Sequence, residues 1–92
     1  MKKIFKYKLQ ETARQQVTMP VGYKILKVDV QFDEIVMWVL VDPEITMVKS
    51  YIRMVGTGHE IEKVESLNYI GSVQRQGGAL ILHVFVEKGV GL

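Results

Sequence analysis

The chain contains no cysteine, only two prolines and no long apolar run. Without cysteine it can form neither disulfides nor thiolate metal sites, which suits a reducing cytoplasm. The longest apolar run, residues 35–41, is far shorter than the roughly 20 residues of a membrane-spanning helix. The first residues alternate lysine with apolar side chains and so lack the apolar core of a signal peptide. We therefore expect one cytoplasmic domain, residues 1–92, with no membrane partner.

Apolar and polar residues alternate over most of the chain, which is typical of β-strands with one buried face. In residues 24–32 this pattern places Leu26, Val28, Val30 and Phe32 on one face. Further strands are expected over 4–9, around Val17 and Met19, and over 35–41, 48–55, 67–74 and 79–87. In the first of these, Phe5, Tyr7 and Leu9 oppose Lys6 and Lys8, the pattern of an edge strand protected by charge.

Short turn signals separate these strands. Residues 19–22 indicate a β-turn with Pro20 second and Gly22 fourth, and Asp33-Glu34 predicts a tight reversal. The Gly-Gly pair in residues 75–78 predicts a hairpin, and residues 60–66 allow one short helical turn. We predict an all-β protein, an antiparallel sandwich or small barrel of about six to eight strands.

Residues 35–41 are apolar on both faces, so their outer face needs a cover. Either Met37 and Val39, or Trp38 with its neighbours, would point away from the sheet. In the last strand Ile81, His83 and Phe85 lie opposite the core-facing positions. The candidate interface residues, which favour a homo-oligomer, are Trp38, Met37, Val39, Ile81 and Phe85.

A polar loop, Gly56-Thr57-Gly58-His59, interrupts the apolar strands. Its backbone N–H groups could converge on a phosphate, with the Thr57 hydroxyl and the His59 ring as further donors. The strand before it presents Tyr51 and Arg53 on a polar face. The alternative is a structural turn that ends the strand. The candidate ligand-binding residues are Gly56, Thr57, Gly58, His59, Tyr51 and Arg53.

The chain has only two histidines, His59 and His83, and neither has metal-ligand spacing to a carboxylate. No serine lies in a nucleophile motif. We therefore expect no enzyme activity, no metal and no cofactor.

Charge divides unevenly along the chain. Residues 1–27 hold seven Lys/Arg against one Glu, whereas residues 28–92 hold five against nine Asp/Glu. This asymmetry fits a phosphate-binding patch, attraction between neighbouring subunits, or lysines that solvate an edge strand. Nucleic-acid binding is less favoured, because Phe5 and Tyr7 point away from Lys6 and Lys8, although Tyr51 and Arg53 do share a face.

Six segments together resemble a family of short uncharacterised proteins common in tailed bacteriophages and prophages. They are residues 4–7, 19–26, 38–43, 56–59, 69–71 and 83–85, and the most specific is the Gly-Thr-Gly-His loop. The resemblance spans nearly the whole chain and implies a phage product in the bacterial cytoplasm, without an established reaction.

Three functions follow as hypotheses. The first is a non-enzymatic, oligomeric phage or prophage accessory protein that inhibits a host component, for example part of a defence system. The second is a nucleotide-sequestering protein with a phosphate at residues 56–59. The third is a small single-stranded nucleic-acid binder.

Overall fold

The computed structural model describes residues 1–89, and the last three positions of the predicted domain lie outside the described residues. Seven strands form two antiparallel sheets, as the alternating pattern predicted. The three-stranded sheet has the order β1-β4-β3 and the four-stranded sheet the order β2-β5-β7-β6. The strands are β1 (Lys3–Leu9), β2 (Arg14–Pro20), β3 (Lys24–Gln31), β4 (Glu34–Val41), β5 (Met47–Gly56), β6 (Leu67–Arg75) and β7 (Leu80–Glu87).

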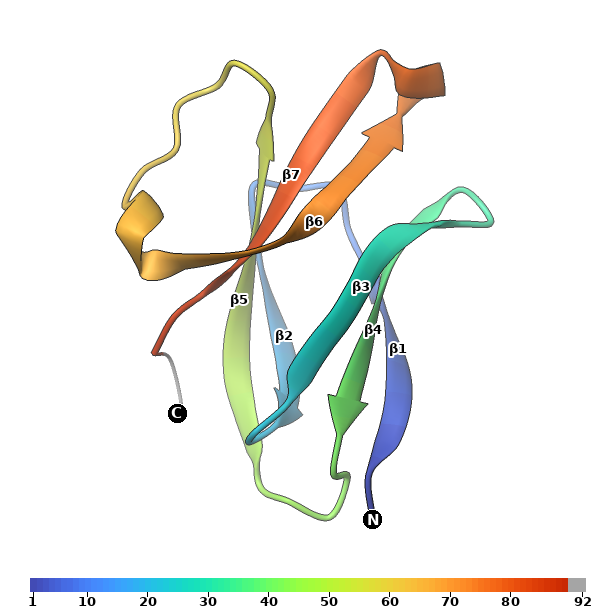
Figure 1. Cartoon of the computed structure of the whole chain (residues 1–92), viewed down its shortest axis with the longest axis vertical. Helices are drawn as coiled ribbons and strands as arrows, with labels where there is room; N and C mark the ends of the chain where they lie inside the picture. The colour runs from blue at the N-terminus through green and yellow to red at the C-terminus, as the bar shows by residue number, and fades with distance from the viewer. Residues whose placement is uncertain (90–92) are drawn as a thin grey trace.

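The chain passes repeatedly between the sheets (Figure 1). Only β3–β4 and β6–β7 are hairpins within one sheet, and the β5–β6 connection skips the position of β7. Two 3-10 turns, η1 (Val64–Ser66) and η2 (Gln76–Gly78), are the helical segments among the described residues. No helix in this part of the chain has the length and apolar character to cross a membrane.

The core lies between the sheets and is built from the inner face of each strand. Met37 and Val39 of β4 are fully buried there, opposite Ile52 of β5 and Val84 of β7. Burying side chains of this kind stabilises the fold by about 1.5–3 kcal/mol each, as an upper estimate.

The sheets approach each other closely where β3 packs on β6. At this crossing Gly71 is needed, because a Cβ built on it would lie 2.9 Å from Cγ1 of Val28. A strand glycine often marks such an approach. The absence of a side chain at Gly71 therefore allows β3 and β6 to approach each other this closely.

Two side chains that were predicted to face the core lie outside it. β3 has a bulge between Ile25 and Lys27, so Leu26 points outward while Ile25 packs on the core. A bulge shifts the alternation by one residue. Phe32 also lies outside the core, in the turn between β3 and β4.

The turns predicted after β2 and between β3 and β4 each lie one residue away from the predicted position. The β3–β4 turn has Phe32 and Asp33 as its central residues, not Asp33 and Glu34, because Gln31 pairs with Glu34. The turn after β2 runs from Pro20 to Tyr23, whose N–H donates to the Pro20 carbonyl, so Pro20 is first and not second.

Candidate functional site

The Gly56–His59 loop ends β5 as a β-turn. The His59 N–H donates to the Gly56 carbonyl (3.1 Å), and Gly58 takes the left-handed conformation (φ 87°) that this turn requires. The Thr57 N–H donates to the Ile81 carbonyl across the strand pair (3.3 Å). Two of the N–H groups that an anion cradle needs are therefore already engaged within the chain, which favours the structural interpretation of the loop.

The two histidines have different surroundings. The His59 ring is exposed and lies over Gly56, where an added Cβ would approach its Cδ2 to 3.2 Å. His83, in the middle of β7, is half-buried and bonded at both ring nitrogens. Its Nε2 lies 2.7 Å from Thr57 Oγ1 and its Nδ1 lies 2.9 Å from Ser72 Oγ. The structure therefore joins Thr57 to His83 and not to His59.

Tyr69 extends this set to a chain of four side chains, which come from the loop after β5 and from β7 and β6. Its hydroxyl lies 2.5 Å from Ser72 Oγ. Either neutral tautomer of His83 satisfies the whole chain, because each hydroxyl can both donate and accept. The arrangement differs from a Ser-His-Asp triad, in which a carboxylate holds the second ring nitrogen. Here the hydroxyl of Thr57 takes that place.

Tyr51 and Arg53 share the outer face of β5, as predicted, and meet a carboxylate there. Arg14 of β2 donates two hydrogen bonds to Glu87 (2.8 and 3.0 Å), and its guanidinium lies 4.1 Å from the centre of the Tyr51 ring. Arg53 Nη1 is 3.9 Å from the same carboxylate. The hydrogen bonds from Arg14 hold the pKa of Glu87 below its ordinary value, while burial opposes them. These charges are largely satisfied within the chain.

Most of the predicted interface residues face inward or are covered. Met37 and Val39 were wrong as interface residues, because both are fully buried between the sheets. Phe85 lies on the outer face of β7 but is buried, with the Tyr69 ring centred 5.5 Å away. Ile81 is half-buried on that face. Of the five, only Trp38 lies on an open apolar surface.

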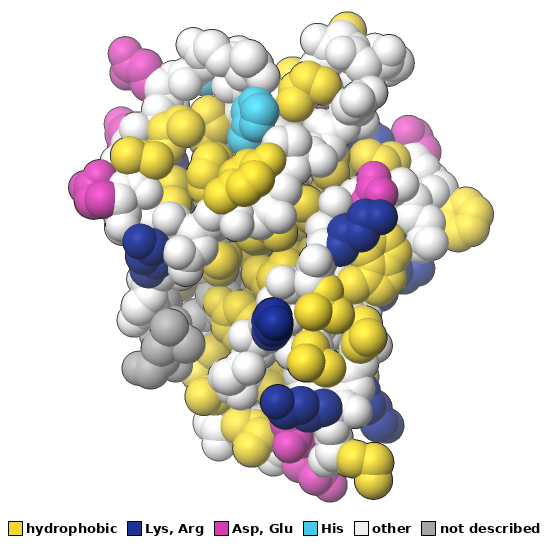
Figure 2. All heavy atoms as spheres, viewed as in Figure 1, with side chains coloured by type: hydrophobic (Ala, Val, Ile, Leu, Met, Phe, Trp, Pro, Cys, Tyr) yellow, Lys and Arg dark blue, Asp and Glu magenta, His cyan; other side chains and the backbone are white. Residues whose placement is uncertain are grey.

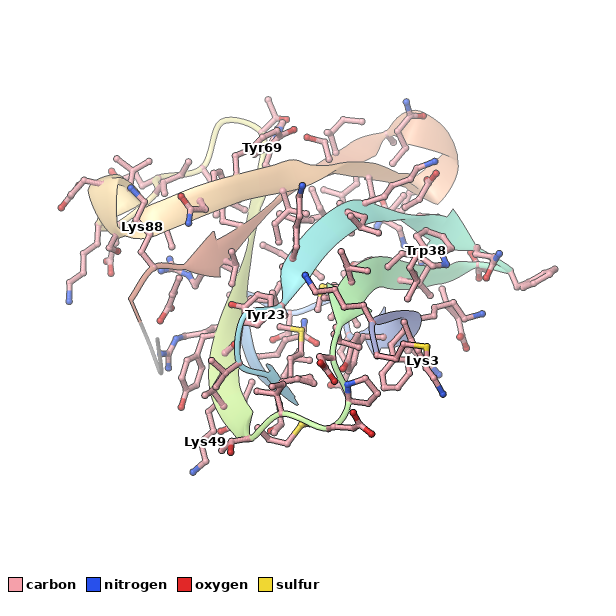
Figure 3. All side chains as sticks on the ribbon, turned by 60° about the horizontal axis from the view of Figure 1, so that its bottom comes forward. Lys3, Tyr23, Trp38, Lys49, Tyr69 and Lys88 are labelled. Atoms are coloured by element: carbon pink, nitrogen blue, oxygen red, sulfur yellow. The ribbon has the colours of Figure 1, made fainter. Side chains whose placement is uncertain are left out.

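Trp38 occupies the centre of the outer face of the three-stranded sheet. On either side of it are Lys6 of β1 and Lys27 of β3, its partners in the strand register. Leu40 has Ile4 and Lys24 as partners, and Val36 has Lys8 and Asp29. An apolar row along β4 is thus bordered by lysines on both neighbouring strands. Figure 3 shows Trp38 on β4, away from β5.

This surface, the Trp38 face, also has a hollow. Ile4, Leu26, Lys27 and Trp38 line a shallow depression of about 330 Å³ whose walls are almost entirely apolar. Ile4 is 59% exposed and Leu26 46% exposed. Figure 2 shows apolar and basic side chains side by side over the half of the molecule that holds β3. Exposed apolar surface with a polar rim is typical of an interaction site.

The local sequence pattern did not predict that the lysines lie beside Trp38, nor which side chains bond to His83. Both depend on strand pairing. The pairing of Ser72 with His83 could have been found from the glycine hairpin that joins their strands. The pairing of β1 with β4 joins distant segments, and no short-range signal reports it.

The chain is thus a small antiparallel β-sandwich with one apolar, lysine-bordered sheet face. It belongs to the family described as Domain of unknown function (DUF7352), whose model matches residues 1–91. No curated protein and no solved structure matches the chain.

Proposed function

We propose that the chain is a non-enzymatic binding protein that docks on another protein through the Trp38 face. The observation that carries this proposal is the placement of Trp38 beside an apolar hollow and between Lys6 and Lys27. Trp is among the residues that most often dominate binding energy, especially where other side chains exclude water around it. The phage or prophage setting implied by the sequence resemblance makes a host protein the natural target of such a surface.

The charges of the face select the chemistry of the target. Lys6, Lys8, Lys24 and Lys27 border the apolar row. Two of them form exposed ion pairs within the chain, Lys8 with Glu34 (2.9 Å) and Lys27 with Asp29 (3.3 Å), so the face keeps an excess of positive charge. Lysines around an apolar centre favour a partner that presents an apolar side chain flanked by carboxylates, because opposite charges then meet across the interface. The same charges also speed the association of the two partners. We therefore propose an acidic protein surface as the target.

The size of the face sets the expected affinity. Three strands about 4.8 Å apart and about eight residues long cover on the order of 350 Å². A standard interface buries about 800 Å² on each partner. The Trp38 face alone therefore supports a modest affinity, and tight binding needs contacts from a neighbouring segment.

Single-stranded nucleic acid is a second candidate, favoured by the same geometry. A base can stack on an indole ring while lysines on both sides contact phosphates. Unlike Phe5 and Tyr7, Trp38 does share its face with Lys6 and Lys8. The apolar hollow beside it favours the protein partner, since aliphatic walls offer a base no hydrogen bond.

The intrinsic fluorescence of Trp38, the single tryptophan of the chain, reports binding at this face directly. The probes are a blocked Asp-Glu-Phe-Asp-Glu peptide, its neutral counterpart Gly-Asn-Phe-Asn-Gly, and a short oligodeoxythymidylate. We expect the acidic peptide to shift the emission of the wild type and to have no effect on Leu26→Glu. Val64→Asn is the matched control, because Val64 is similarly exposed but lies on η1.

The outcomes separate the two candidates. A response to the acidic peptide alone supports the protein partner. A response to the oligonucleotide alone, falling steeply with added salt, replaces it with the nucleic-acid function. Unchanged emission with every probe removes the Trp38 face as a binding surface.

A further inference from the structure

The hairpin between β3 and β4 carries an exposed phenylalanine in an unfavourable conformation. Phe32 is 90% exposed, and both central turn residues have positive φ, 51° at Phe32 and 64° at Asp33. A two-residue turn of this kind favours Asn-Gly, and a bulky side chain at positive φ costs free energy. Phe32 therefore weakens the isolated fold without repaying the cost in core contacts.

Ion pairs and a hydrogen bond hold this hairpin in place. Arg75 lies 3.3 Å from the Asp33 carboxylate and 3.1 Å from that of Glu11, and Lys6 donates to the Gln31 side chain (2.9 Å). Figure 1 shows the β3–β4 loop projecting beyond the neighbouring strands. A projecting apolar side chain on a held loop loses little freedom on binding, which favours a role as an anchor.

The chain itself carries a hollow that suits this anchor. The depression lined by Ile4, Leu26, Lys27 and Trp38, about 330 Å³, is apolar and large enough for a phenyl ring. Its border is basic, whereas the anchor is followed by Asp33, whose carboxylate is 96% exposed although Arg75 is near. Lys27 at that border is paired with Asp29 (3.3 Å), but exposed ion pairs of this kind are weak and can exchange for a contact with Asp33 of another copy. Shape and charge therefore allow the tip of one copy to bind in the hollow of another.

We propose that a second copy of this chain binds at the Trp38 face by placing its Phe32 in the hollow, with its Asp33 beside Lys27. This inference rests on the proposed function, because it gives that face a ligand of related chemistry: an apolar side chain, Phe32, followed directly by the carboxylate of Asp33. Two such contacts related by a two-fold axis close the assembly as a dimer. An external acidic partner then competes with the second copy for the same hollow.

Complementation between two variants tests the proposal. Phe32→Asn removes the tip and keeps the hollow, whereas Leu26→Glu blocks the hollow and keeps the tip. Leu26 is exposed on a bulge, so this change does not disturb the core. Both variants retain Trp38 as the fluorescent reporter. Val64→Asn again serves as the control.

We expect the wild type and the control to associate as concentration rises from about 1 µM to about 1 mM, seen as a doubled mass and shifted Trp38 emission. Each variant alone stays monomeric. An equimolar mixture regains a heterodimer, weaker than the wild-type dimer because one of two contacts is restored. Monomeric Phe32→Asn also unfolds several degrees higher than monomeric wild type, because the turn strain is relieved.

A wild type that stays monomeric over this range overturns the self-association. So does a Phe32→Asn protein that still dimerises, or a mixture that does not. If the monomeric wild type still responds to the acidic phenylalanine peptide, the second copy is rejected while the proposed function stands. If neither the peptide nor a second copy alters Trp38 emission, both fail together.

Discussion

Replacing Gly71 with alanine tests the packing that joins the two sheets. The new Cβ would lie 2.9 Å from Cγ1 of Val28, a buried side chain with few alternative rotamers. Overpacking of this kind costs about 1–3 kcal/mol, and the lower chain entropy of alanine offsets about 0.4–1 kcal/mol. We expect a net loss of about 1–2 kcal/mol in the free energy of unfolding, a drop of roughly 4–16 °C in the midpoint for a domain of this size.

The assay is thermal and urea unfolding of four proteins in a double-mutant cycle. Val28→Ala removes the methyl groups that the new Cβ meets, so Gly71→Ala should cost much less in that background than in the wild type. Gly56→Ala is the matched control, because its Cβ would meet only the exposed His59 ring, which can move. A stable Gly71→Ala protein, or costs that simply add in the cycle, would refute the close approach of β3 and β6.

Three further predictions concern charged and polar contacts. Because Arg14 lowers the pKa of Glu87 in the folded chain, this carboxylate stabilises the fold above its unfolded pKa, about 4.3, and the stability is lost as pH falls through the lower folded pKa. Glu87→Gln should therefore show a smaller stability loss on acidification than the wild type, and an equal loss would remove Glu87 as the cause. The double variant Thr57→Val with His59→Ala should stay folded and lose about 1 kcal/mol, mainly the hydrogen bond to His83. Titration with inorganic phosphate should shift no amide resonance of the loop in the wild type, and saturable shifts would restore the anion cradle.

The strand pattern was predictable wherever alternation is unbroken. β1, β5 and β7 present the expected faces, since Lys6 lies outward, Tyr51 outward, and Val84 inward. In β3 the prediction failed at Leu26, because one extra residue in a bulge reverses the alternation and leaves no separate signal in composition.

The candidate site was less predictable than the fold. Tyr51 and Arg53 were placed correctly on one polar face and Thr57 in the loop that follows their strand, but the partners Glu87 and His83 come from β7 and required the strand order. The backbone hydrogen bonds of Thr57 and His59 could not be predicted from the Gly-Thr-Gly-His sequence alone either.

The Trp38 face was missed for a related reason. Trp38 was predicted as an interface anchor and the lysines as protection for an edge strand. Only the register of β1 with β4 shows that both lie on one surface. The prediction for Phe32 failed in a similar way. The alternating pattern assigned Phe32 to the core, whereas in the structure it lies in the β3–β4 turn and is exposed.

The central claim is that the Trp38 face binds an apolar side chain flanked by carboxylates. Titration of the monomeric Phe32→Asn protein with the blocked Asp-Glu-Phe-Asp-Glu peptide, followed by Trp38 fluorescence, tests it most directly, because this variant keeps the hollow but cannot fill it with a second copy. Saturable emission change, lost when Leu26→Glu is added, is the predicted result. Emission that stays constant at all peptide concentrations would contradict the account.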